Sequence, residues 1–276
     1  MAKVRKSIHE LFEEHYQGIW GERWPALKAA LLLDPQKVKI SNPFEGKAEI
    51  FELDAASLVP PKDLDGQPGE RVLDLCAAPG GKSLMMLFQT KGKIKLTVNE
   101  LSKTRFQRLK AVFYDYLPEE IVQQIDFSCA DGARFCLSHR EEFDRVLVDA
   151  PCSGERHLLK AQDLKDWTPS RSKQLSVRQH SLLCAAMDAC KAGGRVVYST
   201  CAISPLENDR VIQKLLKSRK GQFQVLESES SELKGERTEF GKIYLPDVGA
   251  AGPIYSAILQ KVESNLESSN GEVEAE

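Results

Sequence analysis

The 276-residue chain lacks the sequence features that mark membrane, secreted and metal-binding proteins. No apolar run reaches the roughly 18 residues that a membrane-spanning helix needs. The first 16 residues contain three glutamates and no apolar core of a secretion signal. The seven cysteines include no C-x-x-C pair, and the five histidines have no metal-ligand spacing. We therefore expect a cytoplasmic globular protein that makes no membrane contact and holds no metal ion.

The chain also has little excess charge, with a formal net charge of −2, but this charge is unevenly distributed. Residues 262–276 contain five glutamates and no lysine or arginine, so residues 1–261 carry 38 basic against 35 acidic side chains. Six basic residues lie near Trp167 in one short segment: Arg156, Lys160, Lys165, Arg171, Lys173 and Arg178. This segment is either a strip that contacts the phosphates of a nucleic acid or a solvated loop.

The order of apolar and polar segments predicts one α/β domain with additions at both ends. Residues 7–33 have helical periodicity and belong to an N-terminal extension, residues 1–60. Residues 61–261 alternate strand-like and helix-like segments, which predicts a mostly parallel sheet with helices on both faces. Residues 262–276 have the composition of a disordered acidic tail.

A glycine-rich turn follows the first strand of this domain in VLDLCAAPGGKS, residues 72–83. Cys76 stands where a phosphate-binding P-loop needs glycine, and the dinucleotide fingerprint G-x-G-x-x-G is absent. The turn favours an adenosine cofactor without a pyrophosphate, and S-adenosylmethionine fits that description. Glu100 ends the next strand, where it either accepts hydrogen bonds from ribose hydroxyls or is an ordinary solvated carboxylate. Asp131 ends the third strand and meets the adenine amino group, caps the following helix, or does both.

Two cysteines follow predicted strands at the edge of the sheet where ligands bind. Cys152 lies in VLVDAPCSG, and Cys201 lies in STCAISPLEN. Their loop positions favour reactive thiols. The packing role typical of a free cysteine is expected for the other strand and helix positions, Cys129, Cys136, Cys184 and Cys190.

The residues after Cys201 predict a helix directly beside its thiol. Ser204 and Glu207 have the spacing of a capping box, and Pro205 fits the first helical position. Apolar residues then recur at helical spacing, so we expect a helix over residues 205–220. The N-terminus of that helix would help to ionise the thiol.

Four segments together resemble a known family. FELDAASLVPP, VLDLCAAPGGKS, DAPCSGE and YSTCAISPLEND occur in the order and spacing of the NSUN (Fmu-type) RNA cytosine-5 methyltransferases. The resemblance covers residues 10–260 and is greatest to short members without a PUA-type RNA-binding domain, such as the mitochondrial ribosomal-RNA enzyme. It implies a Rossmann-like fold that binds S-adenosylmethionine, with a small N-terminal helical extension.

The resemblance also implies the site residues. It places the S-adenosylmethionine pocket at Cys76, Ala77, Ala78, Pro79, Gly80, Gly81, Lys82, Glu100, Arg105, Asp131, Gly132 and Asp149. It makes Cys201 the nucleophile and Cys152 the cysteine associated with release of the methylated product. Two positions depart from the family pattern, because Glu100 stands where many members have Asp, and Leu53 where many have Gln.

The implied reaction is covalent catalysis on RNA. Carbon 5 of cytosine is a poor nucleophile, so a thiolate must first add to carbon 6, and Asp149 is placed to hydrogen-bond N3 of the base. We expect a monomer that acts on ribosomal RNA in preference to transfer RNA, with a protein partner where more RNA affinity is needed. Two alternatives stay open: a DNA cytosine-5 methyltransferase that uses Cys152 as nucleophile, and a catalytically idle RNA-binding assembly factor.

Overall fold

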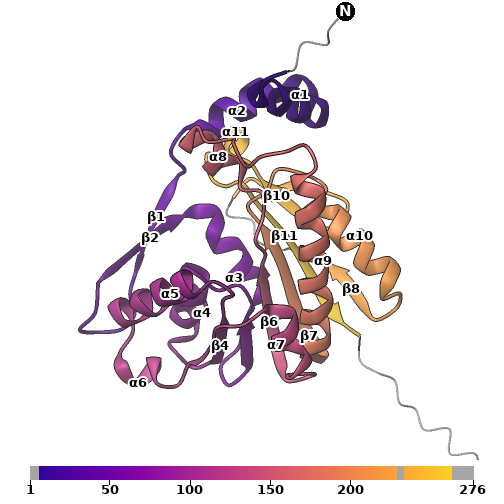
Figure 1. Ribbon diagram of the computed structural model, residues 1–276. Coiled ribbons are helices and arrows are strands. Elements are labelled where there is room, and N and C mark those ends of the chain that lie inside the picture. The colour runs from indigo at the N-terminus through magenta and orange to yellow at the C-terminus, as the bar shows by residue number, and fades with distance from the viewer. Residues whose placement is uncertain (1–5, 229–232, 263–276) are drawn as a thin grey trace, which may run out of the picture.

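The computed structural model describes residues 6–228 and 233–262, so the predicted acidic tail lies almost entirely outside it. Within these ranges a nine-stranded sheet forms the centre of the molecule, in the order β5-β4-β3-β6-β7-β11-β10-β9 with β8 paired to β11 (Figure 1). Its strands are β3 (Arg71–Asp74), β4 (Lys95–Asn99), β5 (Asp126–Ser128), β6 (Phe143–Asp149), β7 (Cys190–Thr200), β8 (Phe223–Leu226), β9 (Glu236–Arg237), β10 (Lys242–Tyr244) and β11 (Ile254–Lys261). A separate two-stranded ribbon consists of β1 (Lys37–Ser41) and β2 (Ile50–Asp54).

The five strands β3 to β7 run parallel to one another, so their carboxyl ends meet at one edge, whereas β11 pairs with β7 antiparallel. They are rich in apolar and β-branched residues, as expected for strands covered on both faces. Alternate residues of β6 enter different cores, with Val146 and Val148 on one face of the sheet and Leu147 on the other. The predicted α/β class with a mostly parallel sheet and helices on both faces is confirmed.

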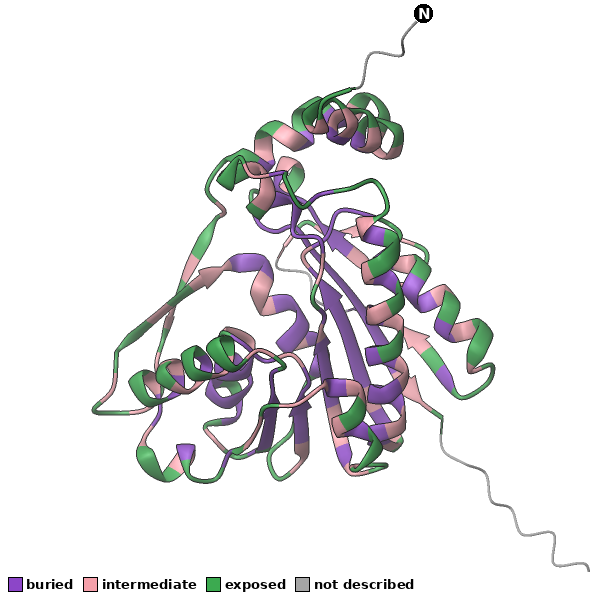
Figure 2. Ribbon diagram, viewed as in Figure 1, coloured by how far each residue is buried: buried purple, intermediate pink, exposed green. Residues whose placement is uncertain are grey.

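Helices cover the two faces of the sheet (Figure 1). One face carries α3 (Val59–Leu64), α4 (Gly81–Thr90) and α5 (Lys103–Tyr116), and the other carries α7 (Gly132–Leu137), α9 (Arg171–Ala189) and α10 (Asp209–Ser218). The connections contain the short helices η2 (Ala55–Leu58), α6 (Glu119–Val122), α8 (Glu155–Ala161) and α11 (Pro246–Gly249). Figure 2 shows the strands buried between helices whose outward sides are exposed. Among the described helices, none combines the length and apolarity that crossing a lipid bilayer requires.

The N-terminal helices pack on the same core as one face of the sheet. α1 (Ile8–Trp20), the turn η1 (Gly21–Arg23) and α2 (Trp24–Leu32) lie beyond the end of the sheet, close to α8 and α11 (Figure 1). The rings of Phe12 and Tyr16 lie 4.9 and 6.2 Å from the ring of Trp167, which belongs to the loop between α8 and α9. The helical extension is therefore joined to the rest of the molecule by apolar packing.

Two predictions for the C-terminal half are wrong. The helix after the second cysteine loop, α10, begins at Asp209 rather than at Pro205, because the intervening residues form turns. Glu207 does not close a capping box, since its carboxylate enters the core and accepts a hydrogen bond from the N–H of Ser153. The strands β8, β9 and β10, which precede the last strand, were not predicted from the sequence. Strands of two to four residues leave little periodicity to detect.

Candidate functional site

The carboxyl ends of β3, β6 and β7 meet at a cavity of about 520 Å³. Its lining includes Cys76, Lys82, Arg105, Asp149, Cys152 and Cys201, and thus both cysteines that the sequence placed at strand ends. A second cavity of about 310 Å³ lies beside the glycine turn, below Phe51 and Leu53 of β2. Lys82 and Asp149 line both cavities, so this pair of side chains stands at the boundary between them.

The glycine turn presents main chain rather than side chains. Gly80 has φ of +111°, and a β-carbon there would lie 2.9 Å from Leu109 of α5, so this position requires glycine. Gly81 begins α4, whose N-terminus offers unpaired N–H groups to a ligand. Burial raises the pKa of the Cys76 thiol well above its usual value, so this cysteine is a neutral part of the wall. The turn therefore fits the predicted adenosine cofactor without a pyrophosphate.

Glu100 is only 3% exposed, so its interpretation as an ordinary solvated carboxylate is wrong. Oε1 accepts a hydrogen bond from the Ser102 N–H at 2.9 Å, and Arg105 forms an ion pair with Oε2 at 3.1 Å. Arg105 also donates to the carbonyl oxygen of Ala78 in the glycine turn at 2.6 Å. Its contact with Oε2 lies outside hydrogen-bond geometry, and no other described residue donates to this buried oxygen. An acceptor for a ligand hydroxyl is therefore available.

Asp131 caps α7, which confirms one of its two predicted roles. Oδ1 accepts hydrogen bonds from the N–H groups of Ala133 and Arg134 at 3.0 and 3.1 Å, while Arg178 of α9 pairs with Oδ2. Burial acts to raise the pKa of Asp131, but these hydrogen bonds and Arg178 outweigh it and lower the pKa. Gly132 serves packing, because a β-carbon there would lie 3.0 Å from Leu182. Any contact of Asp131 with adenine comes in addition to the helix cap.

An ion pair joins Lys82 and Asp149 next to the thiols. The distance between Lys82 Nζ and Asp149 Oδ2 is 2.7 Å, and Ser199 Oγ donates to Oδ1 at 2.8 Å. Burial acts to lower the pKa of Lys82, but the charge of Asp149 and its hydrogen bond raise it overall. The site thus holds a fixed ammonium group beside a carboxylate whose two oxygens are both engaged.

Asp74, which the sequence analysis did not select, is a buried carboxyl group at the end of β3. Ser83 Oγ donates to Oδ2 at 2.6 Å, and Oδ1 has no hydrogen-bond partner among the described residues. Burial, reinforced by Asp149, raises the pKa of Asp74 to about 7. The available signal was a charged residue at the last position of an apolar strand.

Asp74→Asn is expected to raise the free energy of unfolding at pH 8 by about 4 kcal/mol and to change it little at pH 4. Because the folded-state pKa is raised, the protonated Asp74 favours folding fully only below its unfolded pKa, and this stabilisation is lost as the pH rises through 7. Asparagine removes the ionisation and keeps an oxygen for the Ser83 hydroxyl. Urea denaturation at both pH values measures the difference, and an equal change at the two pH values would contradict the prediction.

The thiols of Cys152 and Cys201 face each other with 2.8 Å between their sulfur atoms. Cys201 lies in the electrostatic field of the cations Lys82 and Arg156. The hydrogen bond to Cys201, burial and nearby carboxylates instead raise the pKa of Cys152 well above its usual value. The surroundings of Cys152 thus hold its thiol neutral.

Two glutamates beneath the thiols were not found by the sequence analysis. Glu155 begins α8, Glu207 lies in the same loop after β7 as Cys201, and neither has any exposed surface. Burial and the charge of Glu207 raise the pKa of Glu155. No local pattern marks Glu155, and the capping-box spacing around Glu207 indicated a different role.

The basic segment that begins at Arg156 does not form a continuous phosphate-binding strip. Arg156 is buried and donates to two main-chain carbonyl oxygens, and Trp167 is buried as well. Three further members pair with carboxylates of the chain: Lys160 with Asp34, Lys165 with Asp163 and Arg178 with Asp131. Lys173, in the first turn of α9, is exposed. Within this segment, Lys173 at the start of α9 is therefore the side chain most accessible to a phosphate group.

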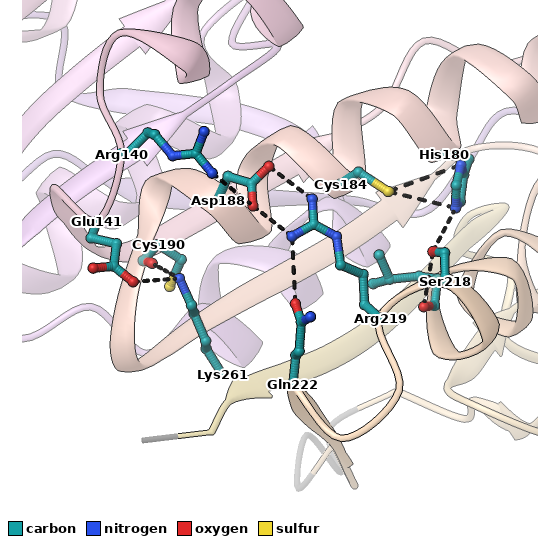
Figure 3. Close-up of polar contacts among 11 residues, drawn as sticks. Arg140, Glu141, His180, Cys184, Asp188, Cys190, Ser218, Arg219, Gln222 and Lys261 are labelled. Atoms are coloured by element: carbon teal, nitrogen blue, oxygen red, sulfur yellow. Dashed lines mark hydrogen bonds and ion pairs between the residues drawn. The ribbon is translucent and has the colours of Figure 1, made fainter. Parts of the chain in front are cut away.

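The cysteines outside the cavity follow the packing prediction in part. Cys136 and Cys190 are buried, but Cys129 is exposed because it lies just beyond the short strand β5. Cys184 is half-buried on α9, with its sulfur 3.5 Å from Nε2 of His180 (Figure 3). Figure 3 also shows Arg219 paired with Asp188, a contact that fastens the end of α10 to α9. No group of three or more side chains suited to a metal ion occurs in the described part of the chain.

Several known proteins are similar to this chain in sequence or in fold. A Bos taurus relative named 5-cytosine rRNA methyltransferase NSUN4 is 40% identical over 185 residues, 65% of this chain and 48% of the relative. A Danio rerio relative named tRNA (cytosine(34)-C(5))-methyltransferase, mitochondrial, is 36% identical over 242 residues, 83% of this chain and 65% of the relative. The crystal structure of a methyltransferase homolog protein from Pyrococcus horikoshii has a similar fold, with a TM-score of 0.72 at 22% identity, covering 92% of this chain and 95% of that one. The chain thus spans about half of the bovine relative's length and 65% of the zebrafish relative's.

The family described as 16S rRNA methyltransferase RsmB/F matches residues 61–260, well over half of the chain. The matched range contains the glycine turn, both loop cysteines and Asp149. The resemblance to the NSUN (Fmu-type) family is confirmed by this match and by the bovine relative, and the Rossmann-like methyltransferase fold by the Pyrococcus structure. The chain belongs to the RsmB/F family of 16S rRNA methyltransferases.

Proposed function

We propose that this protein is an S-adenosylmethionine-dependent RNA methyltransferase that modifies carbon 5 of cytosine, with ribosomal RNA favoured over transfer RNA. The observation that carries the proposal is the pair of thiols 2.8 Å apart beside the ion pair of Lys82 and Asp149. The names of the bovine and zebrafish relatives specify ribosomal and transfer RNA respectively, so both substrates belong in the test. A monomeric state, a cytoplasmic location and a protein partner that adds RNA affinity stay predictions of the sequence.

The glycine turn and the strand ends beside it fit S-adenosylmethionine, which supplies the methyl group when bound. The turn, residues 76–82, holds a ligand through its main chain. Glu100 offers a buried carboxylate oxygen for the ribose hydroxyls, and Arg105 fixes that carboxylate against the turn. Asp131 follows the next strand, where its position suits a contact with the adenine amino group, and the family resemblance includes it in the S-adenosylmethionine pocket.

Cys201 is the thiol placed to attack carbon 6 of the cytosine. The predicted helix N-terminus is absent at Pro205, and the cationic side chains near Cys201 are instead Lys82 and Arg156, which line the same cavity. Addition to carbon 6 moves negative charge onto the base, and a fixed ammonium group such as Lys82 stabilises that charge. Asp149 orients Lys82 and faces the same cavity.

Cys152 serves the last step, in which carbon 5 loses its proton and the bond from Cys201 to carbon 6 breaks. Its sulfur touches the nucleophile's sulfur, so it lies beside the bond that must break. The hydrogen bond to Cys201 and burial raise the pKa of Cys152 and hold it as a thiol, which keeps it from competing as nucleophile. This division of roles is the opposite of the one expected for a DNA-type enzyme.

Methyl transfer by the purified chain tests the proposal. The chain is incubated with tritiated S-adenosylmethionine and total RNA from cells that lack the gene, and bisulfite sequencing locates the modified cytosine. We expect label in ribosomal RNA and none in duplex DNA. RNA binding without transfer would favour the idle assembly factor, and preferred transfer to DNA would overturn the proposed substrate.

Glu100→Ala and Asp131→Ala are each expected to weaken S-adenosylmethionine binding by about 5- to 150-fold, because losing a hydrogen bond to a buried group costs about 1–3 kcal/mol. Calorimetry measures the affinity. Glu119→Ala, an exposed glutamate at the start of α6, is the control and should bind normally. Tighter binding of ATP than of S-adenosylmethionine would contradict the cofactor assignment.

Lys173→Ala is expected to weaken RNA binding and to reduce the slope of log affinity against log salt by about 1, because one phosphate contact is lost. The basis is the exposure of Lys173 at the start of α9, where the other basic residues of its segment are engaged within the protein. Lys93→Ala removes an exposed lysine at the opposite edge of the sheet and is the matched control. Filter binding over a salt series supplies both values, and equal slopes for the two variants would count against this contact.

A further inference from the structure

The two loops that carry the thiols are tied to each other by the buried glutamates. Glu207, from the loop after β7, accepts a hydrogen bond from the N–H of Ser153 in the loop after β6, at 2.9 Å. Glu155, at the end of the loop after β6, accepts one from the N–H of Ile203 in the loop after β7, at 3.3 Å. Each loop therefore supplies a carboxylate that holds the main chain of the other.

The main chain beside each thiol is fixed as well. Gln179 of α9 donates at 2.9 Å to the carbonyl oxygen of the residue just before Cys152, and at the same distance to Glu207. On one side of Cys201, the hydroxyl of Thr200 donates to Asn208 Oδ1 at 2.7 Å. On the other side, Asn208 Nδ2 donates to the carbonyl oxygen of Ala202 at 3.0 Å. The main chain that carries each thiol therefore cannot shift far without breaking one of these hydrogen bonds.

The N-terminal extension enters the same network. The hydroxyl of Tyr16 in α1 donates to Glu155 Oε1 at 2.6 Å, and the hydroxyl of Ser153 donates to the same oxygen at 2.6 Å. All three side chains are buried. A residue of the first helix is thus one hydrogen bond away from a carboxylate that holds the thiol loops.

We propose that Glu155 and Glu207 are positioning residues that fix the separation of the two thiols, with Tyr16 as their support from the N-terminal extension. Neither glutamate lines either cavity, and neither has any exposed surface, so both act on the thiols through protein groups. Two carboxylates buried without a cation are costly to the fold. Cross-linking the thiol loops accounts for their presence. The chemical roles of the two thiols rest on the proposed function, whereas the positioning role concerns only the distance between the thiols and does not depend on that function.

Disulfide formation driven by diamide measures that separation without RNA or cofactor. Diamide takes two electrons and two protons from the two thiols and becomes a hydrazine as the S–S bond forms. We expect Glu207→Ala to slow the cross-linking of Cys152 to Cys201 by about 10- to 100-fold, the effect of losing hydrogen bonds to a charged group. Glu207→Gln keeps a carbonyl oxygen that accepts both bonds and should restore most of the rate. Mass spectrometry of the linked peptides gives the rates.

Two further variants separate positioning from general stability. Asp63→Ala removes another buried carboxylate, which accepts hydrogen bonds from the hydroxyls of Ser228 and Ser256 and lines neither cavity. It should lower the melting temperature and leave the cross-linking rate unchanged. Tyr16→Phe removes one of three hydrogen bonds to Glu155 and should slow cross-linking less than Glu207→Ala does.

Methyl-transfer kinetics complete the test. Glu207→Ala should lower kcat and leave KM for RNA and for S-adenosylmethionine unchanged, with recovery in Glu207→Gln. Cross-linking of Glu207→Ala at the wild-type rate, or equal slowing in Asp63→Ala, would overturn the positioning role. If the unchanged protein cross-links rapidly but transfers no methyl group, the proposed function fails while the positioning role stands.

Discussion

Cys201→Ala is expected to abolish methylation and the covalent enzyme–RNA complex together. Without addition at carbon 6, carbon 5 of the cytosine is not activated for attack on the methyl donor. Removal of a covalent nucleophile typically lowers kcat by at least about 10⁴-fold. The readouts are tritium transfer and a complex that survives denaturing gel electrophoresis. Turnover retained by Cys201→Ala would reduce this thiol to a packing residue.

Cys152→Ala should differ from Cys201→Ala in kind. The variant still has the nucleophile beside Lys82 and should add to carbon 6, methylate once and stall before elimination. We expect its enzyme–RNA complex to accumulate on the gel, and the double variant to form none. A DNA-type enzyme would show the reverse assignment of the two cysteines. An idle assembly factor would show no complex in any variant.

Lys82→Met and Asp149→Asn are each expected to lower kcat by about 100- to 1000-fold, the range for losing one preorganised electrostatic contact in an active site. Loss of either partner leaves the other charge partly buried and unpaired, since the two are 2.7 Å apart. Because they act as a unit, the double variant should lose little more than the worse single variant. Single-turnover rates at saturating cofactor measure the effect.

The control for this cycle is an exposed ion pair outside both cavities, Arg237 of β9 with Glu227. Arg237→Met and Glu227→Gln should change the single-turnover rate less than about twofold, because an exposed ion pair contributes at most about 1 kcal/mol. Additive losses in the Lys82 and Asp149 variants would show that the two side chains act independently, contrary to the structure.

Features that depend on local pattern could be predicted from the sequence. The parallel strands were recognised by their apolar residues. The turn at Gly80 was recognised by the Gly80-Gly81 dipeptide, and the positive φ of Gly80 requires glycine there. Cys152 and Cys201 were found because each follows an apolar strand, and carboxyl ends of parallel strands share an edge. The cap at Asp131 is equally local, since its partners are the next two N–H groups of the helix.

Features that depend on distant partners could not be predicted. Glu207 has the spacing of a capping box, but Ser153 and Gln179 compete for its carboxylate, and they are 54 and 28 residues away. Arg156 was assigned to a basic surface because its partners in the core, Leu31 and Gly252, are 125 and 96 residues away. Charge patterns predict surfaces only when no such partner exists.

The bond from Tyr16 to Glu155 also sets an order of events during synthesis. These residues are 139 positions apart, so at a ribosomal rate of about 5–20 residues per second the first helix waits about 7–28 seconds for its acceptor. Trp167, the ring against which Phe12 packs, emerges later still. Until then α2, through Trp24, covers only part of the apolar side of the first helix, and exposed apolar surface is the condition under which nascent chains engage chaperones. The thiol pair therefore comes together only after Glu207 has left the ribosome, so a shortened translation product cannot carry the assembled site.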